Sequence, residues 1–146
     1  MKKTYNLERF VSAQEYNYAS ALNEIKAGMK RTHWIWYIFP QLKGLGHSRK
    51  ALYYGIEDIE EAKLYLENPI LGARLLEITE ALTQLQESDP SEVMGGDVDS
   101  AKLKSCMTLF AYISESGSIF HRVLKKFFNG ETDSRTIYML EGNHLA

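Results

Sequence analysis

Hydrophobic residues recur along the chain at intervals of three and four positions, and strict alternation over the length of a β-strand is hard to find. That spacing places apolar side chains on one face of an α-helix. The clearest example is the stretch 71–85, where the apolar positions alternate steps of four and three: Leu71, Leu75, Ile78, Leu82 and Leu85. We therefore predict an all-α domain, a compact single-domain bundle of about six or seven helices.

Polar and helix-breaking residues set the expected boundaries. Asn6 is the candidate N-cap of the first helix, and Asp58 with Glu61 has the spacing of a capping box. The segment 86–98 contains Asp-Pro-Ser and Gly-Gly, which predicts a loop, so the next helix should begin at Asp99 or Ser100. Further boundaries are expected at Gly28, Asn68-Pro69, Gly117-Ser118, Asn129-Gly130 and Asp133. One domain should cover residues 1–146, with its core over about 7–140 and a frayed tail at 142–146.

The composition is that of an ordinary globular protein. The 146 residues are 45% hydrophobic and 25% charged, so a core can form without a disulfide or a metal. The single cysteine, Cys106, has apolar neighbours, which predicts an inert core thiol and a reducing, cytoplasmic setting. The longest apolar run, 34–40, is far shorter than the ~20 residues that span a bilayer. We expect a cytoplasmic protein with no membrane segment and no secretory signal.

Charge is distributed unevenly. Between residues 25 and 56 there is no Asp or Glu, and six basic residues give +6, whereas the rest of the chain carries −8. This polarity predicts one face that attracts anions. The overall net charge of −2 argues against a general nucleic-acid packaging role, although it is compatible with one local basic groove.

The carboxylate-free region holds a block of mostly aromatic residues, 33–39, that cannot hide every side chain on one face of a helix or strand. Trp34 and Trp36 are interpreted either as core or as rings that stack on a ligand. His33 is either a general acid or base or a histidine hydrogen-bonded within the core. Gln41, which follows Pro40, either contacts a ligand or closes the turn. Both interpretations stay open in each case.

A glycine-containing turn follows the aromatic block and precedes the next expected helix. If Ser48 caps that helix, its first N–H groups and the neighbouring basic side chains would form a cradle for phosphate or carboxylate. The alternative is an ordinary turn with solvated basic neighbours. The residues concerned are Gly44, Gly46, His47, Ser48, Arg49 and Lys50.

The segment 99–110 is the second candidate region. Helical spacing places Asp99, Lys102 and Ser105 near one line, which would allow a Ser-Lys nucleophile pair. The more ordinary interpretation has Asp99 as an N-cap, Lys102 paired or solvated, and Ser105 packed against a neighbouring helix. No metal site is predicted, because the histidines lie far apart in sequence: His33, His47, His121 and His144.

Four segments together resemble the uncharacterised bacterial domain of unknown function 1810 family, some of whose members carry the label calpastatin: LERFVSAQ, AGMKRTHWIWYIFPQLKGLGHS, YLENPILGARL and KLKSCMTLF. The similarity extends from Leu7 to Leu140. It implies a compact helical domain and no established activity, substrate or cofactor. Cys106 stands where the family usually has a second serine. The calpastatin label has no support in this sequence, because there is no repeated inhibitory segment.

We predict that the aromatic and basic block meets the 102–110 helix to form one pocket for a small anionic or phosphorylated ligand, with no cofactor. The ligand-binding candidates are His33, Trp34, Trp36, Gln41, Ser48, Arg49, Lys102 and Ser105. Whether the protein is an enzyme is left open, with His33 as the catalytic candidate. The alternatives are a noncatalytic module that docks an acidic protein partner and, with less support, RNA binding.

Overall fold

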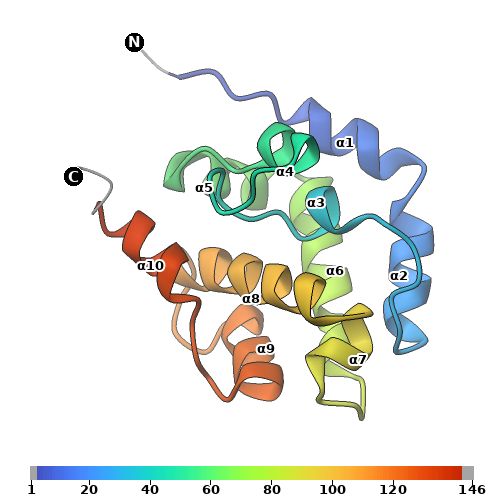
Figure 1. Cartoon of the computed structure of the whole chain (residues 1–146). Helices are drawn as coiled ribbons and strands as arrows, with labels where there is room; N and C mark the ends of the chain where they lie inside the picture. Colours follow the sequence, from blue (N-terminus) through green and yellow to red (C-terminus); the bar gives the residue numbers. More distant parts are fainter. Residues whose placement is uncertain (1–2, 143–146) are drawn as a thin grey trace.

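A computed structural model describes residues 3–142, and within that range it contains ten α-helices and no named β-strand (Figure 1). The helices are α1 Glu8–Glu15, α2 Tyr18–Lys26, α3 Ile35–Ile38, α4 Arg49–Tyr54, α5 Ile59–Glu67, α6 Leu71–Thr83, α7 Pro90–Met94, α8 Asp97–Tyr112, α9 Ile119–Phe128 and α10 Ser134–Leu140. The all-α prediction is confirmed. The count exceeds six or seven because α3, α4 and α7 are each six residues or shorter. The predicted tail lies outside the described residues, apart from its first residue.

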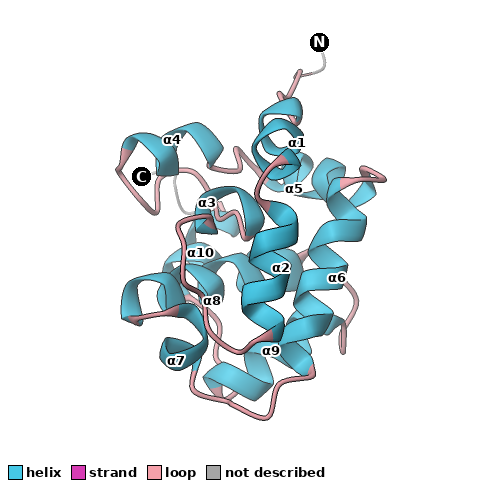
Figure 2. Ribbon diagram, turned by 90° about the vertical axis from the view of Figure 1, so that its right-hand side faces the viewer, coloured by secondary structure: helices cyan, strands magenta, loops and turns pink. Residues whose placement is uncertain are grey.

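The longest helix, α8, forms the centre of the fold. Most of its residues from Leu103 to Ala111 are buried, because α8 packs against α7, α9 and α10 and also touches α3. The second long helix, α6, packs against α2, α5 and α9, and α2 and α6 lie side by side (Figure 2). No helix of the described chain is long and apolar enough to cross a bilayer.

Half of the described helices begin with a residue whose side chain caps the helix. Each cap oxygen accepts a hydrogen bond from a free N–H in the first turn, which fixes where the helix begins. The capping residues are Ser48, Asp58, Asp89, Ser118 and Asp133. The prediction for Asn6 was wrong: α1 begins one residue later, behind Leu7, with no side-chain cap.

The segment 86–98 differs from the expected loop. Asp89 caps α7 and Pro90 occupies its first turn, so the Asp-Pro pair begins a short helix where we expected a turn. Gly95 and Gly96 both have positive φ and separate α7 from α8. Helix α8 therefore begins at Asp97, and neither Asp99 nor Ser100 is its N-cap.

A single backbone bridge closes the segment between α3 and α5. Leu42 pairs with Ile56: the Lys43 N–H donates to the Ile56 carbonyl, and the Ile56 N–H donates to the Gln41 carbonyl, each at 2.8 Å. Gly55 is required at this point, because a Cβ atom there would lie 2.6 Å from the Lys43 backbone. The bridge holds α4 against α3 as a closed surface loop.

Candidate functional site

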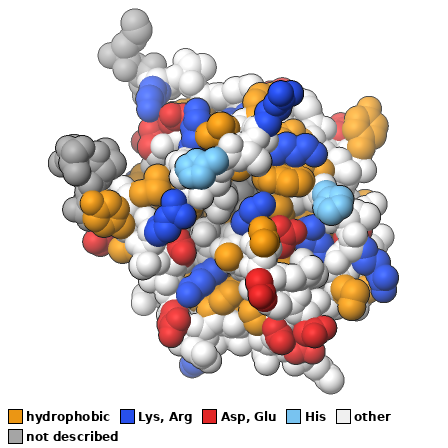
Figure 3. Space-filling view, viewed as in Figure 1, with side chains coloured by type: hydrophobic (Ala, Val, Ile, Leu, Met, Phe, Trp, Pro, Cys, Tyr) orange, Lys and Arg blue, Asp and Glu red, His pale blue; other side chains and the backbone are white. Residues whose placement is uncertain are grey.

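A narrow slot opens where α3, α4 and α8 meet. Counted with the part that opens to solvent it measures about 230 Å³, and it is narrow enough to hold roughly one water molecule. Its lining is mainly apolar and consists of Ile35, Trp36, Phe39, Gln41, Ala51, Tyr54, Gly55 and Lys102. Figure 3 shows Lys and Arg side chains around a hollow on this face of the molecule. Acidic side chains gather in the lower part of the same view.

Trp36 lies in the short helix α3, which Pro40 prevents from continuing. Its indole Nε1 is buried and has no hydrogen-bond partner among residues 3–142. Two ammonium groups lie near the same ring: the Nζ atoms of Lys50 and Lys102 are 4.6 Å and 5.2 Å from its centroid. Cations near an aromatic face are attracted to it, and a buried N–H without an acceptor costs about 1–3 kcal/mol. Trp36 therefore presents an unused donor in positively charged surroundings.

Gln41 contributes to the slot through its side chain. The turn after Pro40 is closed by the Gln41 backbone carbonyl, which accepts from Ile56, while the side chain lines the slot. Gly46 makes this arrangement possible, because a Cβ at that position would lie 2.9 Å from the Ala51 Cβ and 3.3 Å from the Gln41 Nε2. The close approach of the glycine turn to α4 thus leaves the amide at the slot.

Lys102 reaches the slot from α8 and shares a carboxylate with a second lysine. Asp99 Oδ1 lies 3.9 Å from Lys102 Nζ, and Asp99 Oδ2 lies 2.8 Å from Lys30 Nζ. The Lys30 side chain is only 5% exposed, so it takes the shorter and more buried contact. Because one negative charge serves two positive ones, the Lys30, Asp99 and Lys102 group keeps a net positive charge beside the slot.

Trp34, two residues before Trp36, belongs to the core. It is 1% exposed, and its indole Nε1 donates to Glu24 Oε1 at 2.9 Å. Glu24 also accepts from the N–H groups of Arg31 and Thr32 and from the Thr32 hydroxyl. Partial burial opposes ionisation of Glu24, but these hydrogen bonds outweigh it and lower the pKa of the carboxyl to about 2. The Trp34 ring therefore does not line the slot.

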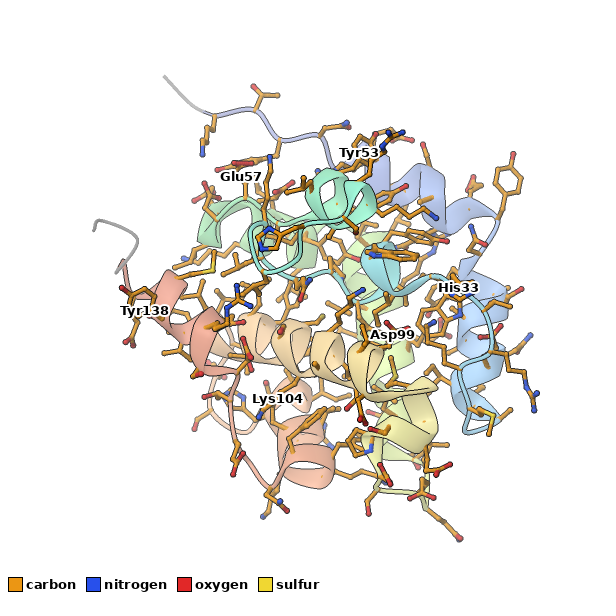
Figure 4. The ribbon with its side chains drawn as sticks, viewed as in Figure 1. His33, Tyr53, Glu57, Asp99, Lys104 and Tyr138 are labelled. Atoms are coloured by element: carbon orange, nitrogen blue, oxygen red, sulfur yellow. The ribbon has the colours of Figure 1, made fainter. Side chains whose placement is uncertain are left out.

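The remaining predicted site residues have other positions. Ser48 caps α4, and its Oγ accepts from the Ala51 N–H at 3.1 Å. Ser105 donates to the carbonyl of Ala101 within its own helix, at 3.2 Å. His33 and Arg49 are exposed and are not part of the slot lining, and Figure 4 places His33 in the connection between α2 and α3. Of the predicted ligand-binding residues, the structure brings together three at the slot: Trp36, Gln41 and Lys102. Cys106 lies in the core, where burial raises the pKa of its thiol.

Several slot residues were not among the sequence-based candidates. Ala51 and Tyr54 lie three residues apart on α4, so they share one face of that helix. That spacing is a local signal that could have found them. Ile35, Phe39 and Gly55 carry no such signal, because apolar residues and glycines in this block are expected in the core or in turns.

A larger hollow lies elsewhere, between the start of α5 and the end of α10. It measures about 930 Å³, counted with the part open to solvent. Three carboxylates line it, those of Glu57, Asp58 and Glu60. Its charge is therefore the wrong one for an anion, and the smaller slot fits the charge pattern of the sequence better. The described residues contain no group of three or more His, Cys, Asp and Glu able to hold a metal ion.

The fold and the site define a small all-helical domain with a slot between its central helix and a helical surface loop. The model of the family described as protein of unknown function (DUF1810) matches residues 4–140, so the chain belongs to that family. It is also similar to the crystal structure of the conserved hypothetical protein Rv1873 from Mycobacterium tuberculosis, with 44% identity and a TM-score of 0.89. That similarity covers 92% of this chain and 96% of the other. No curated protein matches the chain.

Proposed function

We propose that the slot binds a small anionic ligand. The observation that carries this proposal is the Trp36 indole N–H, which is buried without an acceptor and lies in a ring flanked by two ammonium groups. An oxyanion placed at the slot would accept from that N–H and from Gln41 or Lys102. The cost of the unpaired donor would then be recovered on binding.

The charge around the slot supports an anion. Lys102 shares Asp99 with Lys30, and Lys50 adds a further positive charge over the Trp36 ring. The slot walls are mostly apolar, which weakens solvent screening and strengthens attraction for a group that enters.

The arrangement favours binding over catalysis. The predicted catalytic candidate His33 does not line the slot, and the Ser105 hydroxyl donates to its own helix. The Cys106 thiol is fully buried in the core. The slot residues offer hydrogen-bond donors and positive charge, and they do not include a nucleophile paired with a base.

A second candidate is docking of an acidic protein segment on the same face. Leu52 and Tyr53 are 43% and 56% exposed on α4, next to Lys50. Apolar side chains beside basic ones suit a partner that carries carboxylates. In that case the slot would hold one carboxylate of a larger contact, and affinity for isolated small anions would be low.

The two tryptophans provide an internal test. In a ¹H–¹⁵N spectrum their indole N–H groups give separate signals, which Trp36→Phe assigns. We expect acetate or inorganic phosphate to move the Trp36 signal saturably and to leave the Trp34 signal in place, because the Trp34 N–H already donates to Glu24. Lys102→Ala should weaken the response about tenfold, the loss of one charge-assisted interaction.

Lys104→Ala is the matched control. Lys104 lies two residues further on α8 and is 26% exposed, compared with 23% for Lys102, but it pairs with Glu131 and is not part of the slot lining. Equal weakening by both lysine variants would point to nonspecific charge attraction and would refute the anion site. The RNA alternative is tested by measuring RNA affinity at increasing salt concentration, since RNA binding through a basic face would weaken steeply as salt rises.

A further inference from the structure

Resting on the anion site proposed above, we propose that Arg9 is a positioning residue for that site. Arg9 lies in α1, and its guanidinium binds the end of the α4 loop, residues 43–55, which supplies one wall of the slot. Three features support this role: the carbonyl groups that the guanidinium binds, the carboxylate that fixes it, and the narrowness of the slot.

Two donors of the Arg9 guanidinium bind the end of α4, which lies beside α1 (Figure 1). Nε donates to the Tyr53 carbonyl at 2.8 Å, and Nη2 donates to the Gly55 carbonyl at 2.9 Å. Carbonyls at the C-terminal end of a helix have no N–H partner within the helix, so an outside donor satisfies them. Tyr54, which lines the slot, stands between these two carbonyls in the chain. One side chain therefore fixes the backbone on both sides of a slot residue.

A buried ion pair holds the guanidinium itself in place. Arg9 Nη1 lies 2.8 Å from Oε2 of Glu61 in α5, and the two side chains are 8% and 1% exposed. The other Glu61 oxygen, Oε1, accepts from the Glu57 N–H at 2.7 Å. Glu57 follows Ile56, one of the two residues of the backbone bridge. The pair of Arg9 and Glu61 thus fixes the chain just before the bridge residue and just after it.

The slot is sensitive to the position of this loop. It has room for roughly one water molecule, and the loop contributes Ala51, Tyr54 and Gly55 to its lining. Lys50, in the same loop, places its Nζ 4.6 Å from the Trp36 centroid. Helix α4 has six residues, and helices shorter than about 12 residues are marginal in water unless other contacts hold them. Release of the end of α4 would therefore displace both the wall and one of the positive charges.

Arginine is suited to this position, and lysine is not its equivalent. The planar guanidinium presents its donors in fixed directions and here binds two carbonyls and one carboxylate at the same time. A lysine ammonium would keep a positive charge beside Glu61, but its single nitrogen would not reach all three acceptors. Arg9→Lys therefore keeps the charges of the buried pair and loses the hold on α4.

Arg9→Lys tests the role on the full chain, with acetate as the probe at pH 7 and constant ionic strength. The Trp36 indole signal reports binding. We expect acetate to bind the variant about fivefold more weakly than wild type, because apparent affinity falls with the fraction of molecules in which the slot is formed. Without acetate, the Trp36 signal should also move in the variant, while the Trp34 signal, held by the bond to Glu24, should stay in place.

Arg74→Lys is the matched control. The Arg74 guanidinium also lies over an aromatic ring, 5.3 Å from the Tyr18 centroid, and donates to Gln14. No hydrogen bond or ion pair of residues 3–142 joins it to the α4 loop, so this variant should change acetate affinity less than about twofold. Both variants are titrated where urea unfolding shows them to be folded, because a loss of global stability leaves the affinity of folded molecules unchanged.

Glu61→Gln is a second variant, and it keeps the test decisive if Arg9→Lys does not fold. It removes the charge that fixes the guanidinium and keeps the shape of the side chain, so acetate binding should weaken about threefold. Unchanged affinity in a folded Glu61→Gln variant would contradict the positioning role.

The outcomes separate this role from the anion site on which it rests. If acetate binds wild type and Arg9→Lys equally, the positioning role is wrong and the anion site stands. If Arg74→Lys weakens binding as much as Arg9→Lys, Arg9 acts only through the general stability of the fold, and the role is again overturned. If acetate causes no saturable shift of the Trp36 signal in wild type, the anion site fails and the positioning role fails with it.

Discussion

Trp34 and Trp36 stand two residues apart at the start of α3, and each has a lysine ammonium near its ring. Lys30 lies 4.9 Å from the Trp34 centroid and Lys102 5.2 Å from that of Trp36, and Asp99 pairs with both lysines. The surroundings differ at the indole nitrogen: Trp34 donates to Glu24, whereas Trp36 has no partner among the described residues. The same side chain is therefore hydrogen-bonded within the core at one position and has an unpaired indole N–H at the other.

The largest effect should come from the core side of this comparison. Trp34→Ala removes a fully buried ring and leaves Glu24 with one donor fewer, so we expect a loss of about 3–5 kcal/mol in the free energy of unfolding. Trp36→Ala is the matched variant, and it should cost less than half as much because its ring is partly exposed and its N–H is unpaired. Urea unfolding followed by circular dichroism measures both. Equal losses would contradict the assignment of Trp36 to the slot.

Glu24→Gln should have an intermediate effect that depends on pH. The pKa of Glu24 is lowered to about 2 in the folded protein, compared with about 4.3 in an unfolded chain. The ionised Glu24 carboxylate therefore stabilises the fold fully at pH values above the pKa of the unfolded chain. This contribution is lost as the pH falls from about 4.3 towards 2. Because Glu24 is only partly buried, solvent screening limits the contribution to about 1–2 kcal/mol.

The comparison of wild type and Glu24→Gln separates the contribution of Glu24 to the free energy of unfolding from the contributions of other carboxyl groups. The difference in unfolding free energy should be constant between pH 6 and pH 7 by this linkage and should shrink below about pH 4. A difference that stays the same down to pH 2 would show that Glu24 acts through its shape and not through its charge.

The smallest effect on stability should come from Trp36→Phe. This change removes the cost of an N–H that has no partner among residues 3–142 and also removes part of the ring's packing; the two effects oppose each other, so we expect a net change of no more than about 0.5 kcal/mol. Trp34→Phe serves as the control and should cost about 2 kcal/mol, because it removes a hydrogen bond to an ionised carboxylate. Thermal unfolding of the pair provides the measurement. A large loss for Trp36→Phe would mean that its N–H has an acceptor in solution.

Local sequence signals predicted much of the fold. The four-and-three spacing of 71–85 corresponds to α6, and Ser48, Asp58 and Asp133 cap the helices expected behind them. These features depend on residues within one or two turns. The prediction of a loop over 86–98 was wrong because Asp-Pro is compatible both with a turn and with the first turn of a helix. Packing of α7 on α8 selects the helix.

The site could be predicted only in part, since it depends on contacts between distant segments. Sequence placed Trp36, Gln41 and Lys102 in two candidate regions, and the structure brings them to one slot. It could not assign Trp34 to the core and Trp36 to the slot, because every position in that block is apolar or aromatic. Glu24 decides the assignment, and it is ten residues from Trp34 in sequence.

The backbone bridge between Leu42 and Ile56 closes a short surface loop, and this loop divides the lining of the slot into two parts. Ala51, Tyr54 and Gly55 lie inside this loop, whereas Trp36 and Lys102 lie outside it. The slot therefore joins a segment that one backbone bridge closes to a scaffold that the packing of the long helices holds in place.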